Sequence, residues 1–406
     1  AGGRARIGRR LPRALLLLAL AGLWAAAAWF LWQSEVPGDL RLPELDAATE
    51  FTAVELDRAE DYEGFLRWEF VVSQAAVLAV FALYAVFGAR FARESAAGRI
   101  GTGMLLAMLG LGFLWLVQLP IGLIRLWWER KHDVSEVSYW EWVVGTWFGL
   151  GFGFLFICLA IVIVMGLAGP LHDRWWIPGG AVFIGLATLF AYAVPYLLPG
   201  QVPLRDPEVA DDARRLAAEL DVRDIPIKVQ ELGGPPNAAA AGLGPSRRVI
   251  LTDTLVDGPF SQEEVRVVLA HEFGHHARDH IWKSIGWYAL FAFPGAFLIA
   301  RATQRRGGMR DPTAVPLSLF VLVALSFLAL PVENAITRHM EEEADWVALE
   351  ATEDPKAAKD LFRRFSTTTR SDPSPPGWAY VLIANHPSLL ERIAMAEAWE
   401  ARRGGR

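Results

Sequence analysis

Apolar side chains gather in seven long runs along the 406-residue chain, with shorter polar stretches between them. A helix needs roughly 20 apolar residues to cross the hydrocarbon of a bilayer, and each run approaches or reaches that length. The pattern therefore predicts seven membrane-spanning helices, five before a long polar segment and two after it. The runs lie near Leu11 to Trp32, Phe70 to Phe91, Ile100 to Leu123, Thr146 to Leu167, Trp175 to Leu198, Trp282 to Ala300 and Val315 to Pro331.

The first run allows two interpretations, because it follows five arginines and contains the small residues Ala25 to Ala28. Those features are typical of a cleaved signal peptide. The run continues through Trp29 to Trp32, however, so it is longer than a typical signal core and ends in aromatic residues, which membrane interfaces favour. We therefore expect a membrane anchor.

The polar segment after the fifth run opens with the proline-containing stretch Pro199 to Pro207, where the chain leaves the membrane. Ser261 and Glu264 then form a capping box, which marks the start of a helix. The alternation of apolar and polar residues predicts a small α+β module with an exposed strand edge. Its expected elements are a helix at Glu208 to Leu220, strands at Pro226 to Glu231 and Arg247 to Thr254, a turn at Gly242 to Ser246, and a helix from Gln262 to about Ile281.

Arginines concentrate in alternate loops between the apolar runs, whereas the loop from Glu35 to Glu63 is strongly acidic. Short loops rich in lysine and arginine stay in the cytoplasm. This rule predicts a cytoplasmic N-terminus and places the segment from Pro199 to His280 on the opposite side. The arginines that decide the orientation are Arg90, Arg93, Arg99, Arg174, Arg301, Arg305, Arg306 and Arg310.

Composition agrees with a membrane protein and excludes other classes. Hydrophobic residues make up 53% of the chain, which also contains 17 Trp and 23 Phe. The formal net charge is −6, and no basic stretch carries interleaved aromatic residues, so nucleic acid is not an expected partner. Cys158 is the single cysteine, which rules out an internal disulfide and a thiolate metal cluster. Any metal must be held by histidines and carboxylates.

The predicted helix after the polar segment carries the pattern His-Glu-x-x-His, from His271 to His275. Two histidines four residues apart lie on one helical face, where both can bind a Zn²⁺ ion at about 2.0–2.1 Å. Glu272 lies beside them and can take a proton from a zinc-bound water. The pattern predicts a zinc peptidase with His271 and His275 as ligands and Glu272 as general base.

A catalytic zinc ion needs a third protein ligand, and the best candidates follow the seventh run. The segment Glu341 to Asp345 contains three consecutive glutamates that can return to the same side of the membrane as the histidines. Spacing alone does not choose among the three. His280, nearly a turn and a half beyond His275, is not expected to be a ligand.

These motifs resemble those of the type I CAAX prenyl endopeptidases, integral membrane zinc proteases related to HtpX. The resemblance rests on His271 to His275 and on Glu341 to Asp345, preceded by Asn334 and Arg338. It extends from about Phe51 to Met395, and the number of spans favours the CAAX-type branch over HtpX. The family places its protease module in the cytosol, which conflicts with the orientation that the arginines predict.

The resemblance assigns individual roles. It makes Glu341 the third zinc ligand, and it makes Asp345 either the support of the first zinc-bound histidine or a proton donor. Asn385-His386-Pro387 and Arg392 resemble the family's C-terminal segment, in which the histidine steadies the oxyanion and the arginine organises the site and its substrate.

The stretch Asn237-Ala238, followed by Gly242 and the strand Arg247 to Thr254, is similar to the family's edge strand, along which a substrate peptide lies extended. Pairing with an edge strand supplies main-chain hydrogen bonds without requiring a particular side-chain sequence. Asn237 and Ala238 are therefore candidate substrate-binding residues, although an ordinary hairpin remains an alternative.

Together these observations predict a mainly α membrane protein, with about seven transmembrane helices enclosing a chamber and a small α+β zinc metalloprotease module. The expected parts are a five-helix membrane region at 1–198, a soluble α+β segment with the substrate edge strand at 199–260, the metal-binding helix with two further spans at 261–345, and a helical segment that completes the site at 346–406.

We expect a zinc-dependent endopeptidase with one Zn²⁺ per chain, embedded in a lipid bilayer, most simply a bacterial cell membrane. Its substrates would be peptides or membrane-associated proteins, including prenylated CAAX proteins. One alternative is an HtpX-like protease that removes misfolded membrane proteins. Another is a non-catalytic scaffold that binds peptides or lipids, although a scaffold has no reason to keep Glu272.

Overall fold

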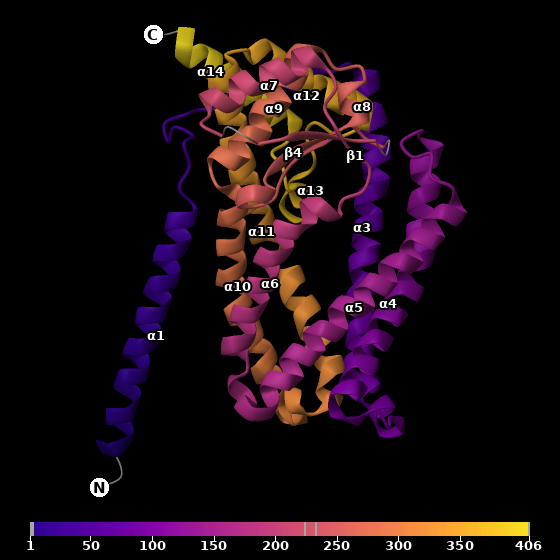
Figure 1. Cartoon of the computed structure of the whole chain (residues 1–406), viewed down its shortest axis with the longest axis vertical. Coiled ribbons are helices and arrows are strands. Elements are labelled where there is room, and N and C mark those ends of the chain that lie inside the picture. Colours follow the sequence, from indigo (N-terminus) through magenta and orange to yellow (C-terminus); the bar gives the residue numbers. More distant parts are fainter. Residues whose placement is uncertain (1–3, 223–224, 232–233, 405–406) are drawn as a thin grey trace.

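The computed structural model describes residues 4–222, 225–231 and 234–404. It consists of a bundle of long helices with a smaller lobe of short helices and one sheet at one end (Figure 1). Among the described residues, six helices are long and apolar enough to cross a membrane. They are α3 (Ala53–Phe87), α4 (Gly98–Lys131), α5 (Tyr139–Leu171), α6 (Trp176–Leu197), α10 (His280–Thr303) and α11 (Val315–Thr352).

These helices bury little of their apolar surface inside the protein. In each of them, only 11% to 22% of the most apolar window is buried. A helix that is apolar on every side but only partly covered by protein needs lipid around the rest. This exposure is the physical reason why the chain is an integral membrane protein.

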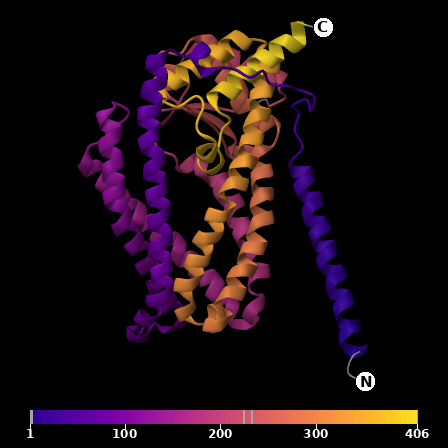
Figure 2. The same ribbon diagram turned by 180° about the vertical axis from the view of Figure 1, so that it is seen from behind.

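The first predicted span forms helix α1 (Arg4–Leu31), which lies beside the bundle rather than inside it (Figures 1 and 2). Its segment Leu18–Leu31 is apolar. The C-terminal end of α1 approaches α10 closely, since a Cβ added to Gly286 would lie 2.9 Å from Cδ2 of Leu31. The C-terminal end of α1 therefore contacts the bundle at the end of the bundle that joins the small lobe.

The arginine-rich loops gather at the end of the bundle that lies away from the small lobe. Short 3-10 helices in these loops contact one another in pairs: η1 (Gly88–Glu94) packs on η6 (Pro312–Ala314), and η2 (His172–Arg174) packs on η5 (Gly308–Arg310). The N-terminal end of α1 points the same way (Figure 1). This is the arrangement that the loop charges predict, and the identity of the cytoplasmic side stays a prediction.

The sheet of the small lobe has four strands in the order β1-β2-β4-β3. β2 and β4 are parallel, the two outer pairs are antiparallel, and β3 forms one edge. β1 was not predicted, because it is short and contains Pro203, which a strand tolerates only at an edge. The strands are β1 (Gln201–Pro203), β2 (Ile227–Gln230), β3 (Ala238–Ala241) and β4 (Arg248–Thr252).

Helices cover the sheet and build one hydrophobic core, which includes Leu216, Leu251, Leu269 and Ile393. The predicted amphipathic helix is α7, whose N-cap Asp206 accepts backbone hydrogen bonds at its start. The remaining helices are α2 (Ala47–Glu50), α7 (Pro207–Glu219), α8 (Asp253–Val256), α9 (Gln262–Ala277), α12 (Pro355–Thr369), α13 (Gly377–Leu382) and α14 (Leu389–Gly404).

Candidate active site

Helix α9 carries the His-Glu-x-x-His pattern and is buried on almost every side. It begins at the predicted capping box, in which Ser261 and Glu264 exchange hydrogen bonds. The carboxylate of Glu264 is also held by Arg364, with Nε 2.9 Å from Oε2. These contacts fix the start of the helix, so that His271 and His275 present the same face to the neighbouring elements.

The chain turns sharply at the end of α9, which corrects the predicted helix boundary. The predicted helix reaches about Ile281, but α9 ends at Ala277 and α10 begins at His280. Asp279 between them has a left-handed backbone with φ of 53°. Aspartate tolerates this conformation better than most residues. The turn carries His280 back toward His275 instead of onward along α9.

Helix α11 brings the carboxylates to α9. It runs without interruption from the membrane region into the small lobe, where it crosses α9 at Gly274. A Cβ at Gly274 would stand 3.2 Å from Cγ1 of Val347 and 3.5 Å from Cα of Ala344. The glycine between the two histidines therefore allows the two helices to approach closely.

The three consecutive glutamates of α11 point in different directions. Glu341 faces the two histidines, with Oε2 at 3.1 Å from Nε2 of His271 and Oε1 at 3.5 Å from Nε2 of His275. The side chain of Glu342 is 40% exposed, whereas Glu343 is buried against His280. The geometry thus singles out Glu341, where the spacing of residues left the choice open.

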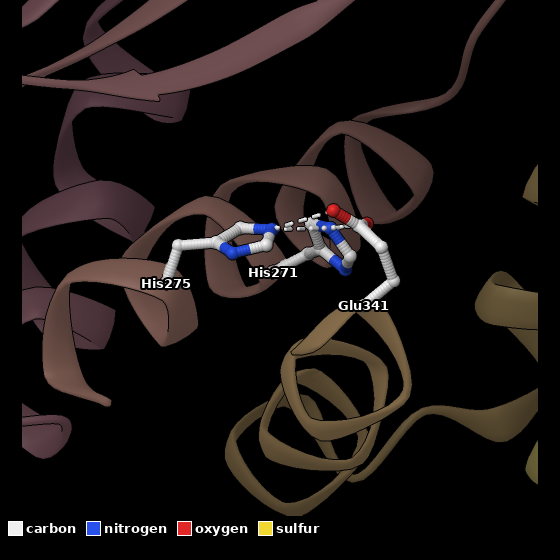
Figure 3. A group of neighbouring side chains, drawn as sticks. All are labelled: His271, His275 and Glu341. Carbon is white, nitrogen blue, oxygen red and sulfur yellow. Dashed lines mark hydrogen bonds and ion pairs between the residues drawn. The ribbon is translucent and has the colours of Figure 1, made fainter. Parts of the chain in front are cut away.

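Three donor atoms converge at this point (Figure 3). One atom each from His271, His275 and Glu341 lies within 4.8 Å of the others, and the two Nε2 atoms are 3.0 Å apart. Such a set of two imidazoles and one carboxylate can hold one metal ion and leave a further position open. The structure thus brings together the three residues that were expected to be ligands.

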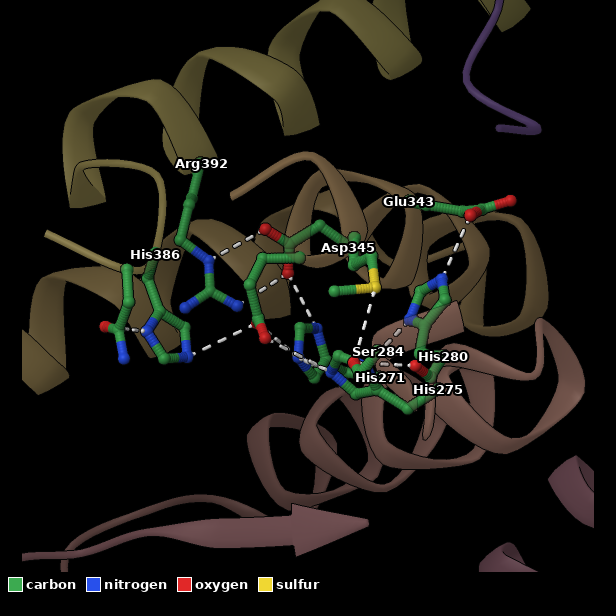
Figure 4. Close-up of polar contacts among 11 residues, drawn as sticks. His271, His275, His280, Ser284, Glu343, Asp345, His386 and Arg392 are labelled. Atoms are coloured by element: carbon green, nitrogen blue, oxygen red, sulfur yellow. Dashed lines mark hydrogen bonds and ion pairs between the residues drawn. The ribbon is translucent and has the colours of Figure 1, made fainter. Parts of the chain in front are cut away.

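Asp345 and Arg392 support His271 from behind (Figure 4). His271 donates its Nδ1–H to Oδ1 of Asp345 at 2.9 Å, which leaves Nε2 free for a metal. The guanidinium of Arg392 donates two hydrogen bonds to the same carboxylate, at 2.8 and 2.6 Å. The side chain of Arg392 is only 13% exposed, and its guanidinium lies over the ring of Phe362. Its expected contact with substrate stays a prediction.

The buried carboxylates around His271 favour a positive charge at this position. Burial alone would lower the pKa of His271, but hydrogen bonds to Asp345 and Glu341 raise it to about 10. Burial raises the pKa of Glu272 to about 7, and the backbone of Ala240 opposes that shift. A buried carboxyl with a pKa near neutrality is well suited to exchange protons with a reacting group.

The metal-binding atoms line a cavity of about 270 Å³, which they share with Glu272, Ala238 to Ala240 and His386. β3 therefore forms one wall of the cavity, and its outer edge is free of any other described strand. Asn237 lies just before this wall, where its Oδ1 accepts a hydrogen bond from the N–H of Ala238 and its main chain pairs with Thr252. Direct contact of Asn237 with substrate stays a prediction.

His386 enters the cavity from the loop that precedes α14. Its side chain is 51% exposed, and its Nε2 lies 3.3 Å from Oε2 of Glu341. Nδ1 lies 2.8 Å from Oδ1 of Asn385. Partial desolvation of the ring by the surrounding cavity lowers its pKa, and the neighbouring Glu341 opposes that shift. This position is open to a ligand in the cavity and close to the metal-binding atoms.

Two histidines beside the motif take different positions. His276 points to the sheet, where Nε2 lies 3.2 Å from the carbonyl oxygen of Arg248, as the 100° step of a helix predicts. His280 lies against His275, a contact that was not predicted because the predicted helix contained both residues. The sequence did not predict the left-handed turn between the two residues, and the only local sign of that turn is the aspartate directly before His280.

Comparisons with known proteins agree with this geometry. Residues 203–400 match the model of peptidase family M48. The chain is 24% identical over 302 residues to an uncharacterized metalloprotease, YhfN, of Bacillus subtilis, covering 70% of this chain and 71% of the relative. It is 24% identical over 287 residues to a CAAX prenyl protease 1 homolog of Oryza sativa subsp. japonica, covering 66% and 67% of the two chains.

Another relative has a higher sequence identity over a smaller share of this chain. Protease HtpX homolog 1 of Streptomyces coelicolor is 31% identical over 267 residues, which cover 57% of this chain and 81% of the relative. Among solved structures, the crystal structure of S. mikatae Ste24p superposes with a TM-score of 0.75 over 93% of this chain and 97% of the other, at 17% identity. This likeness extends the shared fold to the membrane helices.

Proposed function

The chain belongs to peptidase family M48 and is a membrane metalloendopeptidase, and on this basis we propose that it hydrolyses peptide bonds with one zinc ion held by His271, His275 and Glu341. One observation carries the proposal. The three donor atoms, the carboxyl of Glu272 and the edge strand β3 line the same cavity. That cavity lies where the small lobe joins the membrane helices.

The distances between the donor atoms fit zinc. Tetrahedral bonds of about 2.0–2.1 Å place two ligand atoms about 3.3 Å apart. Here the two Nε2 atoms are 3.0 Å apart, and those of His271 and His275 lie 3.1 and 3.5 Å from Oε2 and Oε1 of the Glu341 carboxylate, respectively. A donor set of two histidines and one glutamate is typical of catalytic zinc in peptidases. Zinc held there acts as a Lewis acid toward the scissile carbonyl and increases the acidity of the attacking water.

Glu272 serves as the general base in this proposal. Its carboxyl is buried, has a pKa raised to about 7 and faces the cavity between the metal-binding atoms and β3. It takes a proton from the attacking water and returns it to the leaving amine. His386, half exposed on the other side of Glu341, steadies the oxyanion that develops on the scissile carbonyl.

The substrate is an extended peptide segment that pairs with β3. Every residue of β3 is alanine, so the strand offers main-chain hydrogen bonds and little side-chain selectivity. We propose substrates among peptides and membrane-associated proteins that present such a segment near the bilayer. A bacterial cell membrane is the proposed location, since the chain is rich in alanine, arginine and glycine.

The decisive test is Glu272→Gln in the full-length protein, assayed with a panel of fluorogenic peptides. We expect cleavage to fall by at least about 1000-fold while one zinc per chain is retained, since the amide keeps the shape but cannot accept the proton. Glu263→Gln is a matched control, because Glu263 is exposed on the same helix. Equal cleavage by Glu272→Gln and wild type would refute the catalytic role.

A second experiment tests the ligand set by metal analysis. Glu341→Ala should lose stoichiometric zinc, because it removes one of three donors. Glu342→Ala, which changes the exposed neighbour, should keep it. If the Glu341 variant retains its zinc, the third ligand is another residue.

A further inference from the structure

The Nδ1 atom of His275, on the side of the ring away from the proposed zinc site, meets another histidine. Nδ1 of His275 lies 2.8 Å from Nδ1 of His280, and the two rings stand nearly perpendicular at 73°. His280 is only 3% exposed. Two nitrogens at this distance share one hydrogen, so one ring donates it and the other accepts it.

The next contact decides which ring is the donor. Nε2 of His280 lies 2.9 Å from Oε2 of Glu343, a carboxylate that can only accept when it is ionised. His280 therefore carries its hydrogen on Nε2 and accepts at Nδ1. His275 in turn donates its Nδ1–H, which leaves the lone pair of its Nε2 directed at the metal-binding position.

We propose that His280 and Glu343 form a positioning relay, which fixes the tautomer and the ring orientation of His275 and thereby strengthens zinc binding. The proposal rests on the function proposed above, in which His275 is a zinc ligand. His280 also lines the cavity, but its Nδ1 contacts the Nδ1 of His275 and its Nε2 contacts Glu343, which lies outside the cavity lining, so we assign both residues a role through His275. Hydrogen-bonded partners behind metal-binding histidines commonly contribute in this way.

The far end of the relay is held by the segment that follows the first helix. Lys283 donates to Oε2 of Glu343 at 2.8 Å and to the carbonyl oxygen of Gln33 at 3.1 Å. The backbone N–H of Glu35 donates to Oε1 of Glu343 at 2.9 Å. Both carboxylate oxygens are thus occupied, and the side chain of Glu343 is 3% exposed.

The same segment is fastened to α11. The ring of Trp32 stacks on the ring of His339 with centroids 4.2 Å apart, and His339 also lies 2.8 Å from the carbonyl oxygen of Trp32. Residues Trp32 to Glu35 therefore lie at the far end of the relay, whose members His275, His280 and Glu343 are labelled in Figure 4. The residues that directly follow α1 are therefore part of the support of the proposed zinc site.

A purely structural role for the same contacts makes a different prediction. If the contacts of His280 and Glu343 only stabilised the fold, removing them would lower the unfolding temperature without altering the zinc affinity of the folded protein. A relay must alter the zinc affinity, and its two members must act as one unit. Zinc affinity, measured by competition with a chromophoric chelator, therefore separates the two roles.

The experiment compares His280→Leu with His280→Asn in the purified full-length protein. Leucine keeps the volume but removes the acceptor, and we expect zinc affinity to fall by about 10–100-fold. Asparagine places an oxygen where Nδ1 stood, so it should restore most of the affinity. Equal affinity of His280→Leu and wild type overturns the relay, as does a loss in His280→Asn equal to that in His280→Leu.

A double-mutant cycle adds Glu343→Met, which removes the second acceptor at similar volume. Alone it should weaken zinc binding by about tenfold, whereas in the His280→Leu background it should add less than about twofold. Fully additive losses overturn the relay. Glu342→Met, at the exposed neighbour, is the control that should leave zinc affinity unchanged.

The outcomes also separate the relay from the function on which it rests. A wild-type protein that binds no zinc overturns both proposals. Tight zinc binding by the wild type, together with an unchanged affinity in a folded His280→Leu variant, overturns the relay alone. If His280→Leu does not fold, Glu343→Met and His280→Asn carry the same test.

Discussion

The two histidines of the site stand one turn apart on α9, yet the atoms behind them are organised differently. His271 is supported by a single carboxylate, Asp345, which a buried arginine holds with two hydrogen bonds. His275 is supported by a second histidine, and the carboxylate comes only after it. One support is short and charged, and the other is longer and passes through a neutral ring.

The difference lies also in which parts of the chain are involved. The support of His271 is built by α11 and α14, within the region that matches family M48. The support of His275 ends at Gln33 to Glu35, far outside that region. The short charged support is formed by the protease lobe alone, whereas the longer one also depends on the segment that follows α1.

The largest effect should come from removing the shorter support. Asp345→Ala leaves Arg392 buried without its partner, which typically costs about 3–5 kcal/mol. It also frees the tautomer of His271, so zinc affinity should fall by about 100-fold. Chelator competition and thermal unfolding measure the two losses, with Glu342→Ala as the control on the same helix. A smaller loss than in His280→Leu would reverse the proposed order of the two supports.

Exchanging the cations compares the supports directly. Arg392→Lys loses one of two hydrogen bonds to Asp345, and a lysine does not reproduce the fork of the guanidinium. We expect zinc affinity to fall about tenfold, a loss of about 1.4 kcal/mol. Lys283→Arg makes the reverse exchange at the single hydrogen bond to Glu343 and should change the affinity by less than about twofold. Equal effects would mean that the two carboxylates are held in the same way.

A change at the helix crossing should affect both supports together. Gly274→Ala introduces a Cβ 3.2 Å from Val347, and overpacking of this kind costs about 1–3 kcal/mol. Alanine has a higher helix propensity than glycine, which stabilises the helix by about 1 kcal/mol, so the net loss of stability should be about 1 kcal/mol. Adding Val347→Ala should relieve the contact and raise the unfolding temperature of the single variant. If it lowers that temperature further, close packing at Gly274 is not the cause.

The smallest effect should come from the membrane side of the longer support. Trp32→Ala removes the stack on His339, and aromatic pairs contribute about 0.5–1.5 kcal/mol. The unfolding temperature should drop slightly and zinc affinity should fall by about twofold, without any effect on the Asp345 support. Trp29→Ala, at a side chain 68% exposed, is the matched control and should leave zinc affinity unchanged.

The sequence predicted the membrane helices well but not their ends. An apolar run marks the part of a helix that is surrounded by lipid. The helix itself can continue beyond that part, outside the lipid. The run ending at Pro331 belongs to α11, which continues to Thr352 inside the protease lobe, and α3 begins at Ala53, before the apolar run near Phe70. Hydropathy contains no information about that continuation, because polar residues end the apolar run while the helix goes on, buried in the lobe in α11 and largely exposed at the start of α3.

The proposed site divides in the same way between local and distant information. The spacing of His271 and His275 is local, so one helical turn predicts it. The choice among three glutamates needed the resemblance to a family, since only the crossing of α9 and α11 decides which one faces the histidines. His280 escaped prediction because its position depends on a left-handed turn at Asp279, where no glycine marks the conformation.

The crossing at Gly274 has a mechanical consequence. It lies near Ala344, about 44 Å along α11 from Val315 but only about 4.5 Å from Glu341, at 1.5 Å per residue. If α11 rotated as a rigid rod about this crossing, a displacement of about 5 Å at its membrane end would displace Glu341 by only about 0.5 Å. A rigid tilt of α11 about this crossing would therefore move its membrane end while leaving Glu341 close to His271 and His275.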